Sequence, residues 1–255
     1  MIEIEATQKF SGLAEIYALG RPGYANALAD ALYCRHGFSR QSIIADIGSG
    51  TGKFSRILLD RGSFVYGVEP NADMRAKALR ELSGYANFRA VDGTASETGL
   101  EDNSVDFITA AQAFHWFDVA QFKRECARIL KKNGQIFLIW NIRDNTDAVN
   151  QRCTAVFTQY CPDFKGFSGG LEENDPRIRE FFNDRYAVLE FDHPLVYTEK
   201  NAFIRRCLSS SYSLKEGMEN YPQYLSALET VFDECAKNHV LTLANKTTAY
   251  YGTLY

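Results

Sequence analysis

Three glycines at alternate positions follow a short apolar run that contains an acid, in the segment IIADIGSGTGKF at residues 43–54. A glycine-rich turn between a buried strand and a helix lets a ligand approach the backbone closely, and the helix that follows offers free N–H groups. Gly48, Gly50 and Gly52, with Asp46 two residues before the first, therefore predict a site for a nucleotide, dinucleotide or nucleoside ligand.

The residues that flank the glycines distinguish these ligand classes. The dinucleotide fingerprint G-x-G-x-x-G needs a glycine at position 53, where this chain has Lys53. The phosphate-binding loop G-x-x-x-x-G-K-[ST] does not fit the spacing, and Phe54 stands where that loop needs Ser or Thr. Both departures disfavour a phosphate-centred site.

A second acid, Glu69, ends the next strand-like run. A carboxylate at that strand end can accept two hydrogen bonds from a ribose diol, and the alternative is a solvated acid at a strand end. Asp46 either belongs to the ligand site or orients the loop by bonding nearby backbone N–H groups, and the residues do not rank these two roles.

Strand-like apolar runs alternate with amphipathic helical patterns between about residues 42 and 141. This alternation is typical of parallel βαβ units, and the nearly continuous apolar character indicates strands covered by helices on both faces. The sequence therefore predicts an open, doubly wound α/β sheet. The runs are SIIADI, FVYGVE, ANFRAV, VDFITA and QIFLIW.

The helices between these runs have readable ends. Asn71 and Asp118 are predicted N-caps, and Gly84 is a predicted stop. Lys131 and Lys132 are predicted to complement the C-terminal end of the helix that begins after Asp118.

Composition limits the partners and the compartment. A formal net charge of −4 and a pI near 5.7 disfavour nucleic acid, because such partners need a basic surface. No apolar run has the length of a membrane span, and the N-terminus does not resemble a secretory signal. The six cysteines form no C-x-x-C pair, so we expect reduced thiols, no metal site and a cytoplasmic protein.

Four segments, in order along the chain, resemble class I S-adenosylmethionine-dependent methyltransferases of the small-molecule type 11 kind. They are ADIGSGTGKF, GVEPNADM, VDGTASETGLEDNSVDFI and AAQAFHWFD…ARILKKNGQIFLIW. Two further segments, YALGRPGY and TAYYGTLY, are similar to segments of one subgroup. The resemblance implies a Rossmann-like, mostly parallel seven-stranded sheet with helices on both faces and helical lid or insert segments. It also implies S-adenosylmethionine as cofactor and S-adenosylhomocysteine as product.

The resemblance also implies one methyltransferase domain over residues 1–255. From the logic of the fold, we expect residues 1–40 to form a helical cap near the carboxyl edge of the sheet and residues 41–141 to form the cofactor-binding core. Residues 142–255 would form a C-terminal part with a helical insert at about 199–239 and a last strand at about 246–254. We expect a monomer or a homodimer.

Site residues follow by carrying the family's motifs onto this chain. The glycines would let the backbone pass the cofactor's methionine moiety, and Glu69 would hold the ribose hydroxyls. Pro70 and Met74 would pack against the adenine, although Met74 serves equally well as a core residue. The implied cofactor-binding set is Tyr17, Arg21, Asp46, Gly48, Ser49, Gly50, Gly52, Glu69, Pro70, Met74, Thr94, Ala95, Ala111 and Gln112.

Some of these roles, and that of the candidate catalytic residue His115, have open alternatives. Thr94 and Ala95 occupy the place where many relatives have a Gly-Asp-Ala loop whose aspartate meets the adenine, and Asp92 lies two positions upstream. Arg21 can pair with the cofactor's carboxylate or with an acidic acceptor, or it is a surface arginine beside a Pro-Gly turn. His115 is either a base or acceptor-positioning residue, or a packing residue between aromatics.

Methyl transfer from a sulfonium is an in-line displacement, so the protein mainly aligns the two reactants and excludes water. We therefore predict a methyltransferase that acts on a small molecule, by O-methylation, with a carboxylate as one candidate acceptor because some relatives with the same HWF region act on small carboxylic acids. The alternatives are an NAD-dependent oxidoreductase of Rossmann fold, a non-catalytic S-adenosylmethionine-binding protein and a nucleic-acid methyltransferase.

Overall fold

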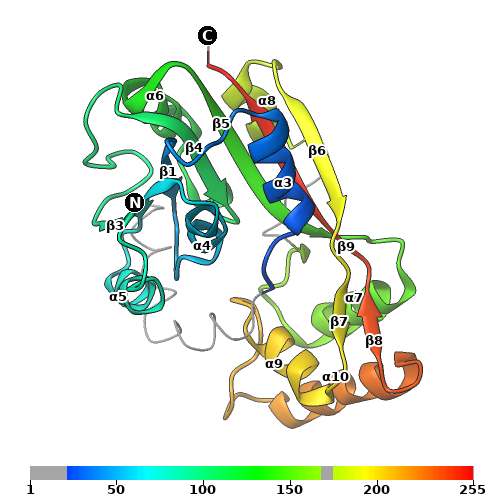
Figure 1. Cartoon of the computed structure of the whole chain (residues 1–255). Coiled ribbons are helices and arrows are strands. Elements are labelled where there is room, and N and C mark those ends of the chain that lie inside the picture. The colour runs from blue at the N-terminus through cyan, green and yellow to red at the C-terminus, as the bar shows by residue number, and fades with distance from the viewer. Residues whose placement is uncertain (1–21, 168–174, 255) are drawn as a thin grey trace.

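A seven-stranded sheet forms the centre of the computed structural model, which describes residues 22–167 and 175–254 (Figure 1). The first five strands along the chain run parallel, and β9 pairs antiparallel with both β5 and β6. In their order across the sheet, the strands are β3 (Phe88–Val91), β2 (Phe64–Val68), β1 (Ile43–Ile47), β4 (Val105–Ala111), β5 (Leu130–Arg143), β9 (Asn245–Gly252) and β6 (Ala187–Asp192). The predicted doubly wound, mostly parallel sheet is confirmed.

Helices cover both faces of this sheet. On one face α3 (Asn26–Arg35), α4 (Lys53–Asp60) and α5 (Ala72–Glu81) pack into one hydrophobic cluster with β1, β2 and β5. On the other face α6 (Val119–Ile129) and α8 (Pro176–Phe182) pack with β4 and β5. Alternate residues of β1 supply the two clusters, since Ile44 belongs to the first and Ala45 to the second, as the two-residue period of a strand requires.

The order of the strands creates the place for a ligand. β1 lies between β2 and β4, so the chain leaves β1 and β4 toward opposite sides of the sheet. Ligands bind in the crevice outside the carboxyl ends of strands at such a switch point. Residues 48–52, after β1, and residues 112–116, after β4, therefore lie next to each other at this edge of the sheet.

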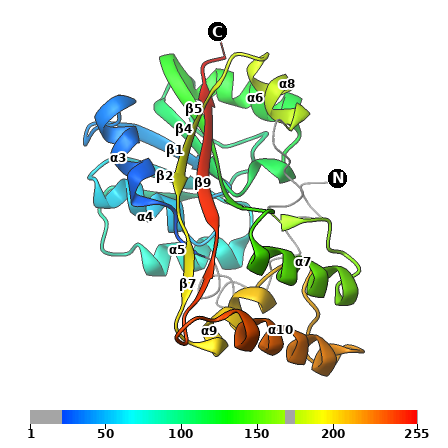
Figure 2. The same cartoon turned by 90° about the vertical axis from the view of Figure 1, so that its right-hand side faces the viewer.

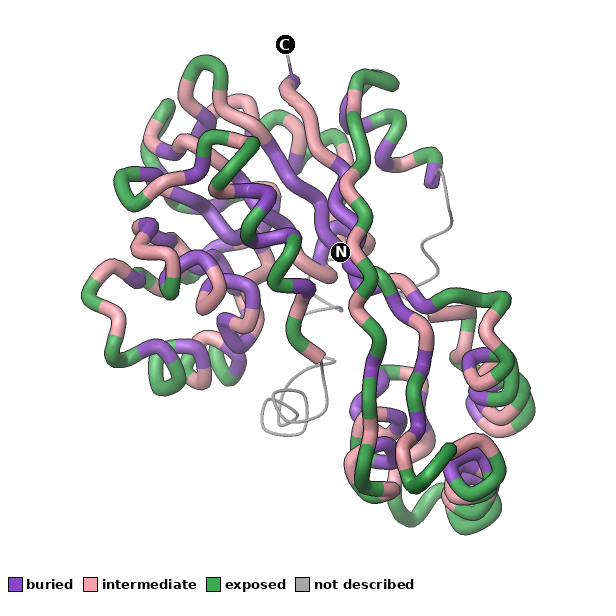
Figure 3. The backbone as a smooth tube through the Cα atoms, turned by 45° about the vertical axis from the view of Figure 1, so that its right-hand side comes forward, coloured by how far each residue is buried: buried purple, intermediate pink, exposed green. Residues whose placement is uncertain are grey.

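A smaller group of elements extends from the antiparallel strands, and we call it the small lobe. It consists of α7 (Ala148–Tyr160), β7 (Leu195–Tyr197), α9 (Lys200–Leu208), α10 (Tyr221–Cys235) and β8 (Leu241–Leu243), and β7 and β8 pair with each other (Figure 2). Its buried residues form a hydrophobic cluster separate from those of the sheet (Figure 3). The strand-like segment YAVLEFDHPLVY is divided into β6 and β7 around His193 and Pro194, because proline cannot continue a ladder.

Predictions for the ends of elements had mixed outcomes. Asn71 and Asp118 are N-caps, since their side chains accept hydrogen bonds from the backbone N–H groups of residues 74 and 121. Gly84 is not the stop of α5, which ends at Glu81 before any glycine is needed. The prediction for Lys131 was wrong, because β5 already begins at Leu130 and the Lys131 ammonium pairs with Asp106 at 2.9 Å.

The predicted place of the N-terminal helices was also wrong for the part that the structure describes. α3 lies against a face of the sheet, where Leu28 and Leu32 are fully buried, and not at its carboxyl edge. Residues 22–25, before α3, approach that edge, where the backbone N–H of Ala25 donates to Thr247 Oγ1 and the carbonyl of Gly23 accepts from Asn141.

Candidate active site

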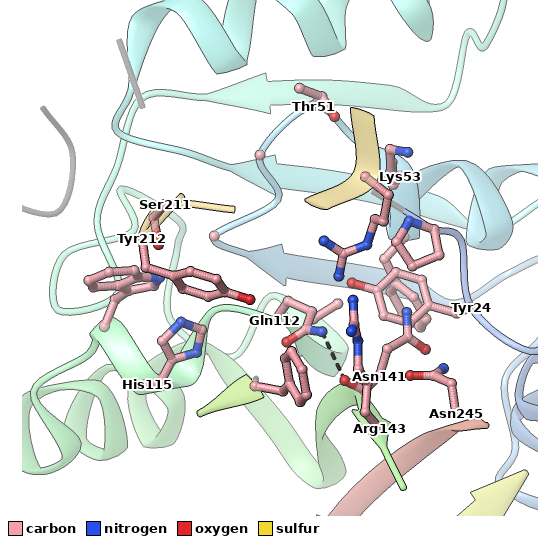
Figure 4. A pocket seen from close by; sticks show the side chains of 18 of the residues that line it. Tyr24, Thr51, Lys53, Gln112, His115, Asn141, Arg143, Ser211, Tyr212 and Asn245 are labelled. Atoms are coloured by element: carbon pink, nitrogen blue, oxygen red, sulfur yellow. Dashed lines mark hydrogen bonds between the residues drawn. The ribbon is translucent and has the colours of Figure 1, made fainter. Parts of the chain in front are cut away.

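A cavity of about 610 Å³ opens at the carboxyl ends of β1 and β4, between the sheet and the small lobe (Figure 4). This is the size range of small-molecule and cofactor sites. The sheet side contributes the glycine loop and the residues after β4, and the lobe side contributes residues between α7 and α8 and around α9. Its lining includes Tyr24, Asp46, Gly48, Ser49, Gly50, Lys53, Ala111, Gln112, His115, Trp116, Asn141, Arg143, Asp163, Lys165, Phe167, Arg206, Tyr212, Lys215 and Asn245.

The three glycines of the loop have different surroundings. All three have positive φ angles, of 69°, 55° and 81°, which side chains other than glycine rarely adopt. A Cβ on Gly48 would meet the Cβ of Ala113 at 2.6 Å, and one on Gly52 would meet Leu82 at 2.6 Å, whereas one on Gly50 would meet nothing within 4 Å. Packing inside the protein therefore accounts for Gly48 and Gly52, and only Gly50 faces open space that a ligand can fill.

Glu69 holds the glycine loop in place. Its carboxylate accepts hydrogen bonds from the backbone N–H groups of Gly50 and Asn71, both at 2.9 Å. The side chain is mostly buried, and burial raises its pKa despite these bonds. Each carboxylate oxygen can accept a second hydrogen bond, so the arrangement is compatible with the predicted contact to a ribose diol, which stays a prediction.

Asp46 is bonded entirely within the protein. Its two carboxylate oxygens accept from Ser55 Oγ at 2.6 Å and from Thr109 Oγ1 at 2.8 Å. Complete burial raises the pKa of Asp46 to about 6, against the lowering effect of these hydrogen bonds. These contacts connect β1, α4 and β4, and they favour the loop-orienting role over direct ligand contact.

The partners of Asp46 stand out in the sequence as polar residues at positions where apolar ones are expected. Thr109 is a polar residue within the apolar run of β4, where it is the register partner of Asp46, and Ser55 lies in the first turn of α4. Both are completely buried.

Some residues of the predicted cofactor-binding set line the cavity and others do not. Asp46, Gly48, Ser49, Gly50, Ala111 and Gln112 line it, together with His115. The others that the structure describes do not border it, and Met74 and Ala95 are only 3% and 4% exposed. Tyr17 and Arg21 lie outside the described residues. The residues that do not border the cavity are Gly52, Glu69, Pro70, Met74, Thr94 and Ala95.

The ends of β2 and β3 are joined by Arg75. Its guanidinium donates to the backbone carbonyls of Glu69 and Pro70, at 2.8 and 3.1 Å, and pairs with Asp92 at 2.8 Å. Next to Asp92, the hydroxyl of Thr94 accepts from the N–H of Glu97 at 3.0 Å and so stabilises a tight turn.

The end of β4 has an unusual backbone at Gln112. Its φ of 56° lies in the left-handed region, and its N–H donates to the carbonyl of Ile139 at 2.8 Å. Strained backbone of this kind in a residue other than glycine is concentrated at functional sites. The side-chain amide donates to the carbonyl of Asn141 at 3.3 Å, so Gln112 connects the ends of β4 and β5 at the cavity wall.

His115 follows in a short 3₁₀ helix, Phe114–Trp116, and its ring lies 4.9 Å from that of Trp116. An acid that the sequence did not reveal, Asp175, lies close enough for the charge of His115 to act on it. Burial raises the pKa of Asp175, but hydrogen bonds from Arg177 and the charges of Arg177 and His115 outweigh this effect and hold the pKa low. A buried, ionised acid is thus present near the imidazole.

Sequence reasoning missed the residues that close the cavity from the C-terminal half of the chain. Figure 4 shows Tyr212 projecting from the small lobe on the same side as His115, and Arg143, Asn141 and Tyr24 on the other side of Gln112. Asn141 is fixed by hydrogen bonds, donating to Gly23 at 2.8 Å and accepting from Thr247 at 2.7 Å. Tyr24 ends the YALGRPGY segment, but Asn141, Arg143 and Tyr212 belong to no motif, so only the fold brings them to the cavity.

The chain is similar to known proteins named as methyltransferases. Residues 45–138 match the family model described as a methyltransferase domain. An uncharacterized methyltransferase-like protein of Schizosaccharomyces pombe is 34% identical over 59% of this chain and 58% of its own length. An uncharacterized methyltransferase of Mycobacterium bovis is 38% identical over 53% of each chain, so this chain matches little more than half the length of these relatives.

The fold has a solved counterpart. A proposed type II methyltransferase from Anaeromyxobacter dehalogenans superposes with a TM-score of 0.62 at 21% identity, over 92% of this chain and 98% of its own. At that identity the likeness concerns the fold alone.

The cysteines, the possible metal-binding groups and the helices of the described residues do not meet what a disulfide, a metal site or a membrane span requires. All six cysteines are unpaired thiols. Within residues 22–167 and 175–254, no group of three or more histidine, cysteine, aspartate or glutamate side chains is arranged to hold a metal ion. Nor does any helix in those ranges have the length and apolar character that crossing a membrane requires.

Proposed function

We propose that this chain, which contains a class I S-adenosylmethionine-dependent methyltransferase domain of the type 11 kind, transfers the methyl group to an oxygen atom of a small molecule. The observation that supports this most strongly is the cavity of about 610 Å³ that runs from the glycine loop, past His115, to the small lobe. It has room for a second ligand beside the cofactor, and a carboxylate oxygen is our first candidate for the acceptor atom.

The residues fit the cofactor at the loop. The open space above Gly50, which a Cβ would enter without touching protein, suits the methionine part of S-adenosylmethionine. Glu69 would accept from the ribose hydroxyls, and Pro70 and Met74 would lie toward the adenine. When bound, the cofactor supplies a methyl group on a positively charged sulfur.

The residues after β4 would align the acceptor. Gln112, held in its left-handed conformation, and His115 border the space beyond the loop. If the acceptor is a hydroxyl, His115 would take its proton, and the nearby charge of Asp175 would favour the resulting imidazolium. If the acceptor is a carboxylate it needs no base, and His115 would position it.

The competing functions have less support. An NAD-dependent oxidoreductase would not explain the methyltransferase-domain match or Lys53 at the position of the third fingerprint glycine. A non-catalytic binding protein would be favoured by a blocked acceptor space. Instead, the described part of the CPDFKGFSGG segment, including Asp163, Lys165 and Phe167, lines the cavity and leaves it open.

The test is an acceptor screen by mass spectrometry. The protein is incubated with S-adenosylmethionine and a panel of small acids, phenols and amines, and both S-adenosylhomocysteine and a product heavier by one methyl are sought. Loss of the added methyl on mild alkaline hydrolysis identifies an ester and hence a carboxylate acceptor. Thermal stabilisation by NAD, without stabilisation by S-adenosylmethionine or S-adenosylhomocysteine, would refute the proposal.

A further inference from the structure

We propose that the part of the cavity around Arg143 is an anion subsite that binds a carboxylate group of the acceptor away from the reacting atom. This assignment rests on the proposed function, and it names the substrate class as acids that carry a carboxylate beside the methylated group. Arg143 lies at the end of β5 and lines the cavity.

Arg143 is a buried cation. The residue is 5% exposed, and its Nη1 atom is completely buried and has no hydrogen-bond partner. Among the residues that the structure describes, no carboxylate pairs with it. Its guanidinium carbon lies 4.1 Å from the centroid of the Phe167 ring, which is a stacking contact and does not neutralise the charge.

A buried guanidinium with an unbonded N–H group lowers the free energy of unfolding unless another interaction compensates for it. A buried charge normally has a paired acid or bonds to all its donors, and a hydrophobic residue of similar size would be more stable at this position. The presence of arginine here therefore indicates a missing anion, and the side chain's place in the cavity wall indicates that the anion is a ligand.

The surroundings reinforce the positive charge. Arg206 of α9, Lys215 after it and Lys165 after α7 line the same cavity. Burial raises the pKa of Tyr197, and the charges of Arg206 and Arg143 both oppose this effect, so the two guanidinium groups lie around one tyrosine. Of the acids in the lining, Asp46 is bonded by Ser55 and Thr109, and Asp163 is exposed.

The geometry favours a carboxylate among anions. One face of the Arg143 guanidinium stacks on Phe167, and the group also contacts the Cys153 thiol. A guanidinium binds a flat carboxylate through two parallel in-plane hydrogen bonds, which is why a carboxylate is our choice among anions. In Figure 4 Arg143 and His115 lie on different sides of Gln112. An acceptor could thus place one carboxylate at Arg143 and present another oxygen near Gln112 and His115.

The test uses Arg143→Met and, as a matched control, Arg205→Met, which removes an exposed arginine of α9 that does not line the cavity. Binding is measured by calorimetry at constant ionic strength, first of S-adenosylhomocysteine alone. The complex is then titrated with the linear dicarboxylates from malonate to adipate, with glutaramide as the neutral counterpart of glutarate, and with inorganic phosphate.

We expect at least one dicarboxylate to bind saturably and glutaramide not to bind. Arg143→Met should weaken the dicarboxylate at least about thirtyfold, leave S-adenosylhomocysteine affinity within about twofold, and keep or raise the melting temperature, since it removes an unpaired buried charge. Arg205→Met should change none of these values.

Four outcomes would contradict the assignment. Absence of saturable binding by every dicarboxylate, or binding of phosphate alone, would remove the carboxylate subsite. A loss of S-adenosylhomocysteine affinity in Arg143→Met equal to the loss for the acid would assign Arg143 to the cofactor's own carboxylate. A fall in melting temperature with unchanged acid binding would make the residue structural. Failure of the unaltered protein to bind S-adenosylhomocysteine would instead refute the proposed function.

Discussion

Gly50 and Gly52 lie two residues apart in the same loop and would respond differently to one added methyl group. A Cβ at Gly50 enters open space, and a Cβ at Gly52 meets Leu82 at 2.6 Å. Both positions have positive φ, so alanine is strained at either one. Alanine at Gly50 should therefore report mainly on ligand contact, and alanine at Gly52 mainly on packing inside the protein.

We expect Gly50→Ala to lower the free energy of unfolding by roughly 1–2 kcal/mol and to weaken S-adenosylhomocysteine at least about tenfold. Gly52→Ala should lower the free energy of unfolding by roughly 2–4 kcal/mol, because overpacking against Leu82 adds to the strain, and should change affinity less. Denaturant unfolding and calorimetry measure the two quantities. The loop assignment fails if Gly50→Ala binds the cofactor product as well as the unaltered chain does.

Glu69 bonds the glycine loop and is predicted to bind the ribose, so its removal should weaken cofactor binding in two ways. We expect Glu69→Ala to weaken S-adenosylhomocysteine by roughly 10- to 100-fold, because hydrogen bonds to a charged group are lost and the N–H of Gly50 loses its acceptor. Glu81→Ala, which removes an exposed acid of α5, is the control and should leave calorimetric affinity unchanged. Equal affinities for the two variants would show that Glu69 does not hold the ribose.

At the scale of elements, Asp46 is the point where β1, α4 and β4 meet, and its raised pKa has a consequence for stability. An acid whose pKa is higher in the folded state than in the unfolded state binds its proton more tightly when folded. Its contribution is therefore complete below the unfolded pKa of 3.8 and is lost as the pH rises through about 6. The full loss, from well below pH 3.8 to well above pH 6, amounts to about 3 kcal/mol.

The measurement is denaturant unfolding of the unaltered chain and of Asp46→Asn at several pH values from 4 to 7. The asparagine keeps hydrogen bonds to Ser55 and Thr109, because hydroxyls can accept as well as donate, but it cannot ionise. We expect the free energy of unfolding of the unaltered chain, relative to the variant, to fall by roughly 2–2.5 kcal/mol across this range. A constant difference would mean that Asp46 has an ordinary pKa.

Elements were predictable from sequence to the extent that their signals are local. The apolar runs predicted the parallel strands, and side-chain caps such as Asn71 and Asp118 predicted where helices begin. The end of α6 was not predictable, because Lys131 is held by Asp106 of a neighbouring strand and not by its own helix. Likewise the motif after β1 predicted the loop at the cavity, but Arg143, Tyr212 and Lys215 come from segments that only tertiary packing brings there.

At the scale of the whole molecule, the small lobe has a core of its own. Phe157 is fully buried there, and its ring contacts those of Phe164, Tyr212 and Tyr224. None of these four residues belongs to the clusters that pack against the sheet. Destabilising the core of the small lobe should therefore open the lobe locally and leave the cofactor site folded.

We expect Phe157→Ala to cost about 3–5 kcal/mol locally and to speed amide hydrogen exchange in α7, α9 and α10 more than in β1, β2 and α4. S-adenosylhomocysteine should still bind. Phe122→Ala, which empties a comparable space between α6 and the sheet, is the matched variant and should reverse the pattern. Uniform acceleration over the whole chain in both variants would show a single cooperative unit.

The chain leaves the sheet for the small lobe after β6 and returns to it in β9, and Asp192 and Lys246 at these two points are register partners. The ends of the intervening stretch are thus held side by side by the β6–β9 ladder, so its length and content add little closure entropy to the sheet. Residues 193–245 accordingly form a cassette that could be transplanted between relatives, provided that it matches α7. Exchange of such cassettes offers a route by which one methyl-donor site acquires new acceptors.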